Sequence, residues 1–182
     1  MSIPRILGIA GSLRVGSINR RLLETATEAM PAADWTIARL RAIPPYDADI
    51  EARSLPPPVD RLKEQIFEAD ALVIASPEYN HSIPGVLKNA IDWASRPPGR
   101  SPLAGKPVIL LGASPGSSGA ARALDHLRIV LESTGAHPMP EQLSVPRVRD
   151  HLSDGEFDDA VLADLRRVLR QLDAVLVAPS VR

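Results

Sequence analysis

A loop near the start of the chain carries the polar side chains whose types and spacing best fit a chemical task. It holds three neutral hydrogen-bond donors and one guanidinium, namely Ser12, Ser17, Asn19 and Arg14. An apolar run at residues 6–10 precedes it and an amphipathic helical pattern follows it. Free main-chain amides and the helix dipole favour negative charge at such a helix N-terminus. The sequence therefore predicts an anion site in this loop.

The loop lacks the two common phosphate-binding sequence motifs, and this limits the kinds of anion that it can bind. It has no Gly-x-x-x-x-Gly-Lys-Ser/Thr pattern, and Gly11 and Gly16 are wrongly spaced for a Gly-x-Gly-x-x-Gly dinucleotide motif. Without a lysine to meet a triphosphate, the donors suit a terminal monophosphate better. The simpler interpretation is that Ser17 or Asn19 only caps the helix. A cap, however, needs neither the apolar run, the glycine at its end nor the arginine.

A second polar segment follows another apolar run, and it contains Pro77, Glu78, Tyr79 and Asn80. Tyr79 is one of only six aromatic residues, and it can lie along a flat ring while Asn80 and main-chain amides meet ring heteroatoms. The alternative is a rigid turn that caps the next helix, with Ser82 as N-cap. Both interpretations can hold, because one loop can cap a helix and line a pocket.

A third loop follows the next apolar run and is rich in glycine and serine. Gly112, Gly116 and Gly119 remove side chains where another group has to approach the backbone closely. Alone this is a weak signal. At the same sheet edge as the other two loops, it indicates a planar ligand contacted by main chain.

Short apolar runs alternate with helical patterns along the chain. The expected strands cover residues 6–10, 35–40, 70–76, 106–112 and 137–145. The expected helices cover residues 18–30, 59–68, 83–94, 119–133 and 156–177, and the proline-rich residues 41–58 are expected to be irregular. This alternation predicts an α/β fold, a five-stranded parallel sheet in the flavodoxin-like doubly wound order 2-1-3-4-5, within a three-layer sandwich. Ligands then lie at the carboxyl ends of the first and third strands, where the strand order reverses.

Composition bounds the function. The 182 residues suffice for one domain, predicted to span residues 1–182. The formal net charge of −1 argues against a nucleic-acid partner, and no apolar run reaches the length of a membrane span. The absence of cysteine excludes disulfides, thiolate metal sites and thiol nucleophiles. The four histidines have no metal-ligand spacing, so no metal site is predicted, and a cytoplasmic location is expected.

With these motifs in place, the sequence resembles the NADPH-dependent FMN reductase family, which includes soluble quinone, chromate and azo reductases. The matching stretches are residues 11–23, 76–96 and 102–128. The resemblance implies an FMN phosphate held by Ser12, Arg14, Ser17, Ile18 and Asn19. It implies an isoalloxazine ring held by Pro77, Glu78, Tyr79 and Asn80, with the pyrimidine edge near Ala113, Ser114 and Gly116. Two departures are Ala113, where relatives often have a hydroxyl residue, and Ala120, where a second glycine is frequent.

The resemblance implies a reaction carried by the flavin, with NADPH or NADH as donor and a quinone or similar small molecule as acceptor, so no catalytic side chain is required. The scarcity of aromatics in the three loops leaves a ring face open, which favours an enzyme over an electron carrier or sensor. A phosphate-ligand binding domain without redox function is a third hypothesis, and hydrolysis by paired carboxylates a weaker one. The family also implies a homodimer or homotetramer, with residues 83–96 and 119–133 at the interface. Trp93 belongs either to that interface or to the core.

Overall fold

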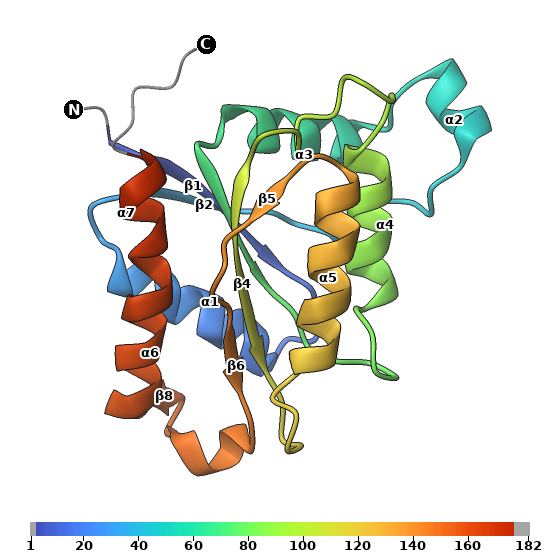
Figure 1. Ribbon diagram of the computed structural model, residues 1–182. Coiled ribbons are helices and arrows are strands. Elements are labelled where there is room, and N and C mark those ends of the chain that lie inside the picture. Colours follow the sequence, from blue (N-terminus) through green and yellow to red (C-terminus); the bar gives the residue numbers. More distant parts are fainter. Residues whose placement is uncertain (1–2, 177–182) are drawn as a thin grey trace.

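The computed structural model of the protein describes residues 3–176, which fold around one central parallel sheet (Figure 1). Its strands are β1 (Arg5–Ala10), β2 (Asp34–Ile37), β3 (Ala71–Ala75), β4 (Pro107–Ala113), β5 (His137–Pro138) and β6 (Leu143–Val145). They lie in the order β2-β1-β3-β4-β5, and β6 also pairs with β4. Every pairing is parallel. The predicted class and strand order are therefore confirmed.

Alternating side chains of the strands build a hydrophobic core on each face of the sheet. In β3, for example, Val73 packs into one core, while Leu72 and Ile74 pack into the other. The first core is covered by α1 (Ile18–Ala29), α6 (Asp159–Leu169) and α7 (Gln171–Leu176). The second is covered by α3 (Pro57–Glu68), α4 (Gly85–Ala94) and α5 (Ala121–Ser133). The two helical layers on either side of the sheet make the predicted sandwich (Figure 1).

Two strands differ from the expected ranges. The predicted fifth strand is divided into β5 and β6, both of which pair with β4. Pro138 and Pro140 have no N–H to donate to a ladder, which accounts for the interruption between the two pieces. β2 ends at Ile37 rather than at residue 40, so Arg39 lies in the loop that follows.

The expected helix over residues 156–177 begins later than predicted, and residue 177 lies outside the described residues. A 3₁₀ turn and a small hairpin precede it, formed by η1 (Val148–His151), β7 (Leu152–Ser153) and β8 (Glu156–Phe157). Asp154 and Gly155 form the hairpin turn with φ of 51° and 84°, which is typical of an Asp-Gly type I′ turn. Asp158 then caps α6 by accepting a hydrogen bond from the main-chain N–H three residues on (3.0 Å).

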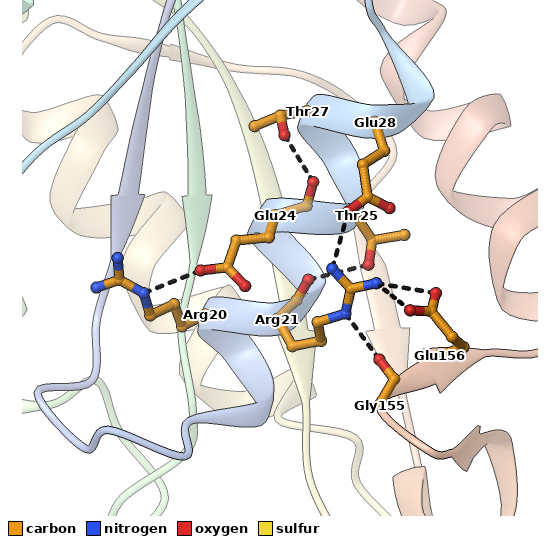
Figure 2. A network of polar contacts seen from close by, with 8 residues as sticks. All are labelled: Arg20, Arg21, Glu24, Thr25, Thr27, Glu28, Gly155 and Glu156. Atoms are coloured by element: carbon orange, nitrogen blue, oxygen red, sulfur yellow. Dashed lines mark hydrogen bonds and ion pairs between the residues drawn. The ribbon is translucent and has the colours of Figure 1, made fainter.

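Arg21 anchors this hairpin to α1, the helix that follows the first polar loop (Figure 2). Its guanidinium donates to the carbonyl of Gly155 at 2.7 Å and to both carboxylate oxygens of Glu156 at 2.8 Å. It also donates to Glu28 at 2.9 Å. The bidentate pair fixes the geometry more than a single exposed ion pair would. The hairpin is therefore fastened to the same helix that presents its N-terminus to the site.

The segment expected to be irregular contains one short helix, α2 (Ala48–Arg53), capped by Asp47. The segment is held against α4 by Trp93, whose indole N–H donates to the carbonyl of Pro44 at 2.9 Å. The ring of Tyr46 packs edge-on against the indole, with centroids 5.0 Å apart. Trp93 is fully buried within the chain, so the structure assigns it to the core and not to the predicted interface.

Candidate functional site

The first loop ends in an open helix N-terminus. Ser17 caps α1, because its hydroxyl accepts a hydrogen bond from the main-chain N–H of Arg20 at 3.2 Å. Within the described residues, no acceptor takes the main-chain N–H groups of Ile18 and Asn19. The cap and the anion site are therefore compatible, since the cap uses one donor and leaves two free for a ligand.

Gly11, Ser12 and Arg14 shape the entry to this helix. A Cβ at Gly11 would lie 3.2 Å from both Leu87 and the hydroxyl of Ser76, so the loop passes closely against the start of the second polar loop. Ser12 is buried and its hydroxyl accepts from the N–H of Arg14 at 3.3 Å. The guanidinium of Arg14 is exposed and has no partner among residues 3–176. It is therefore available to an anion.

Asn19 connects the first loop to the third. Its amide donates to the carbonyl of Ala113 at 2.9 Å and accepts from the N–H of Ala113 at 2.8 Å, and both residues are buried. This reciprocal pair uses both main-chain groups of Ala113. The two residues were predicted as separate ligand contacts. In the structure they bond to each other and hold α1 against the end of β4.

The second loop forms a tight turn. Tyr79 and Ser82 exchange two main-chain hydrogen bonds, at 2.9 and 3.0 Å, around Asn80 and His81. Both central residues have positive φ, 50° and 62°, as a type I′ turn requires. Ser82 is thus a turn residue, and its predicted role as N-cap is wrong. α4 begins at Gly85, with Pro84 in the cap position.

The turn presents side chains to solvent and encloses one carboxylate. Tyr79 is 46% exposed, whereas the side chain of Glu78 is only 9% exposed. Glu78 accepts hydrogen bonds from Ser118 (3.2 Å) and Arg122 (3.4 Å), and lies 3.2 Å from the Nδ1 of His81. Burial alone would raise the pKa of Glu78, but these hydrogen bonds and the charge of Arg122 outweigh it and lower the pKa from its ordinary value. The ionised carboxylate ties the second loop to the third.

The third loop is held by main-chain bonds to the segment after β6. The N–H and carbonyl of Ser114 bond to the carbonyl of Val145 and the N–H of Val148, both at 3.1 Å. Gly119 has φ 58°, and a Cβ there would lie 2.6 Å from the main-chain nitrogen of Pro146, so only glycine fits. Ala120 adopts φ 71° with its methyl group buried, so this departure from the family pattern does not prevent the left-handed backbone before α5.

The comparisons with known proteins agree with this geometry. A family model described as NADPH-dependent FMN reductase matches residues 4–150. An NAD(P)H-dependent FMN reductase of Pseudomonas aeruginosa is 48% identical over 155 residues, 85% of this chain and 81% of that protein. The chain belongs to the NADPH-dependent FMN reductase family. This confirms the predicted family, and with it the enzyme class and the cofactors, FMN with NAD(P)H.

Two further matches show how far the likeness extends within the FMN reductase family. A quinone reductase of Escherichia coli is 46% identical over 130 residues, which are 70% of this chain and 69% of that protein. The solved structure of FerB, a flavoenzyme NAD(P)H:(acceptor) oxidoreductase of Paracoccus denitrificans, has a TM-score of 0.81 at 32% identity. The match covers 94% of each chain.

The donor set of this FMN reductase fits an FMN phosphate. The amides of Ile18 and Asn19, the hydroxyl of Ser12 and the guanidinium of Arg14 are all at the first loop, and none of these four donors has an acceptor among the described residues. The network around Glu78 was missed from the sequence, because Ser118 and Arg122 meet it only through the fold. The one signal in the sequence for this network was a charged residue, Arg122, in the first turn of the expected helix over residues 119–133.

A metal site, a hydrolytic carboxylate pair and a membrane-spanning helix each require side chains or helices that can be checked in the described part of the chain. Across residues 3–176 no group of three or more histidine, aspartate or glutamate side chains is placed to hold a metal ion. Of the carboxylates considered as a hydrolytic pair, Asp92 pairs with Lys88 at 2.6 Å and Glu78 accepts hydrogen bonds from Ser118 and Arg122, so each has partners of its own. None of the helices in this range is long and apolar enough to span a membrane.

Proposed function

We propose that this FMN reductase transfers electrons from NADPH or NADH to quinones or similar small acceptors, such as chromate, azo and nitro compounds, by a ping-pong reaction. The observation that carries the proposal is the meeting of three loops at one sheet edge: free amides at the N-terminus of α1, a half-exposed Tyr79 and a glycine-rich loop after β4 whose shape is fixed by main-chain bonds. The names of the relatives, which include quinone reductases, support quinones as the class of acceptor.

The first loop would hold the FMN phosphate. The N–H groups of Ile18 and Asn19 and the hydroxyl of Ser12 supply neutral donors, and Arg14 supplies the charge. Ser17 contributes chiefly by capping α1, which keeps the free amides aimed at the same point. Asn19 contributes with its side chain by fixing the distance between this loop and Ala113.

The second and third loops would hold the ring. Pro77, Glu78, Tyr79 and Asn80 supply its main-chain contacts on one side, and Ser114 and Gly116 face its pyrimidine edge from the other. Glu78 keeps the two loops at a fixed separation through Ser118 and Arg122. When bound, FMN supplies the hydride-transfer chemistry. The chain's own residues bind and orient it, and we assign no side chain the role of proton donor or nucleophile.

The test is to purify the protein, add FMN, remove free flavin and record the visible spectrum and the rate of NADPH oxidation with 1,4-benzoquinone. We expect a yellow protein that oxidises one equivalent of NADPH per flavin without an acceptor and sustains NADPH oxidation beyond that only while the quinone is present. A protein that stays colourless after FMN is added contradicts the proposal. Flavin binding without sustained NADPH oxidation would instead favour the electron-carrier alternative.

Tyr79 offers a residue-level test of the acceptor site. Because its ring is half exposed and its main chain holds the turn through Ser82, a Tyr79→Ser variant keeps the turn and changes only the exposed surface. We expect the variant to retain FMN and to rank a set of quinones by kcat/KM in a different order from the native protein. Loss of FMN with an unchanged order of acceptors would place Tyr79 against the flavin and away from the acceptor.

We further propose a single domain that assembles as a homodimer or homotetramer in the cytoplasm. The exposed apolar side chain of Ile129 on α5, a helix implied at the interface by the family resemblance, supports assembly. Light scattering after size-exclusion chromatography, compared between the native chain and Ile129→Glu, tests this. A native mass of one chain would refute it.

A further inference from the structure

A cationic cavity lies beside the first loop, on the side away from the predicted ring site. It has a volume of about 560 Å³ and lies between the loop after β1 and the residues that follow β2. Four arginines line it, two from the first loop and α1 and two from the loop after β2: Arg14, Arg20, Arg39 and Arg41. No aspartate or glutamate is among its lining residues. This concentration of one charge contrasts with the formal net charge of −1 for the whole chain.

The guanidinium groups around this arginine cavity keep most of their donors free. Arg39 is exposed and has no partner among the described residues. Arg41 donates one bond, to the carbonyl of Leu13 at 2.6 Å, which brings its guanidinium over the first loop. Arg20 donates through Nε to Glu24 at 3.0 Å, and Figure 2 shows its two terminal nitrogens turned away from that carboxylate. Glu24 is thus the one carboxylate that any of these four arginines engages in the described structure.

Four like charges around one cavity repel each other. A doubly charged anion between them would attract all four, so the net electrostatic interaction in the cavity would become favourable. Planar guanidinium groups recognise phosphate with paired N–H donors, and they hold it better than lysine ammonium groups do. The cavity also shares Ser12 and Arg14 with the loop that we assign to the FMN phosphate. Whatever anion binds here therefore lies directly beside that phosphate.

We propose that the arginine cavity binds the 2′-phosphate of NADPH and so makes this enzyme select NADPH over NADH. The proposal rests on the proposed function, because the nicotinamide has to lie on the flavin ring. From there the dinucleotide runs back across the first loop towards β2, and its adenosine ribose reaches the cavity. NADH carries a hydroxyl in place of the 2′-phosphate and would leave Arg20, Arg39 and Arg41 without that anion, while Arg14 still faces the FMN phosphate.

Two nucleotides that differ only in this group test the cavity directly. Isothermal titration of the purified protein, with and without added FMN, with adenosine 2′,5′-bisphosphate and with 5′-AMP compares binding with and without the 2′-phosphate. We expect the bisphosphate to bind about ten- to a hundredfold more tightly, the range for charge-assisted hydrogen bonds. Arg39→Ala should remove most of that difference and raise KM for NADPH but not for NADH. Arg39 has no partner among residues 3–176, so this variant should fold normally.

Arg100→Ala is the matched control. Arg100 is likewise exposed, but it follows α4 and lies before β4, at the opposite edge of the sheet. Equal affinity for the two nucleotides in the native protein would overturn the proposal, as would equal effects of the two substitutions. A loss of FMN in Arg39→Ala would overturn it too, because the cavity would then belong to the FMN phosphate. Neither nucleotide contains nicotinamide or requires turnover, so the binding result stands even if the flavin test of the proposed function fails.

Discussion

Replacing Asn19 with alanine should cost this protein far more stability than the loss of one surface amide. The substitution removes two hydrogen bonds, of 2.9 and 2.8 Å, from Ala113. Asn19 is 4% exposed and Ala113 3%, so the N–H and carbonyl of Ala113 are left buried without partners. Each unsatisfied buried group costs about 1–3 kcal/mol, which gives about 2–4 kcal/mol when partial access of water is allowed for. For a chain of this size that is a fall in Tm of roughly 4–16 °C.

The measurement is urea unfolding of FMN-free protein followed by circular dichroism, because bound FMN would stabilise the folded state by mass action. Gln171 provides the matched control. Its amide makes the same reciprocal pair with the main chain of Glu141, at 2.9 and 3.0 Å, but at the exposed surface. Water replaces those bonds in Gln171→Ala, so we expect a loss within about 1 kcal/mol. Equal losses in the two variants would refute the reasoning that burial decides the cost.

Three further predictions concern the same loops. Arg14→Ala should weaken FMN binding by about 1.5–3 kcal/mol in a fluorescence titration without lowering the Tm, and an unchanged Kd would mean that main-chain groups alone hold the phosphate. Gly119→Ala should destabilise the fold by about 2 kcal/mol or more in urea unfolding, because of its left-handed φ and the contact with Pro146. Gly16→Ala, in open space, should stay within about 0.5 kcal/mol, and similar losses in both would refute the argument. Since the pKa of Glu78 is lowered from its value in the unfolded chain, its ionised form stabilises the fold above that unfolded value, and the contribution is lost as pH falls through the lowered pKa. Glu78→Gln should therefore be less stable than the native protein at pH 7, and a stability gap that does not close in acid would contradict this.

The order and placement of the main strands could be predicted because they are buried on both faces and therefore continuously apolar. β3 illustrates this, since all five of its residues are buried. The divided fifth strand and the hairpin at Asp154 and Gly155 were missed for opposite reasons. In the first, Pro138 and Pro140 interrupt a segment whose apolar residues still predict one strand. In the second, the helical periodicity of the residues that follow outweighs the Asp-Gly turn signal.

The site was predictable where neighbouring residues act together and not where the fold brings distant ones together. The cap by Ser17 and the turn around Asn80 depend on residues close in sequence. The bond between Asn19 and Ala113 spans 94 positions, and the one between Glu78 and Arg122 spans 44. No local pattern specifies such a partner. Arg39 is a similar case, because it joins the first loop only after β1 and β2 pair.

The main-chain bonds that hold the loop after β4 have a consequence for how this enzyme could be altered. The loop keeps its shape because Ser114 bonds to residues 145–148 through its N–H and carbonyl, and Gly116 does so through its carbonyl. The N–H of Gly116 donates to the hydroxyl of Ser114 within the loop. Pro115 and Ser117 are exposed, and their side chains form no bond within the described structure. Changes at these two positions therefore alter the chemical surface at the edge of the site while the backbone stays in place. They form a natural pair for a combinatorial library in which acceptor range is varied with little loss of folded protein.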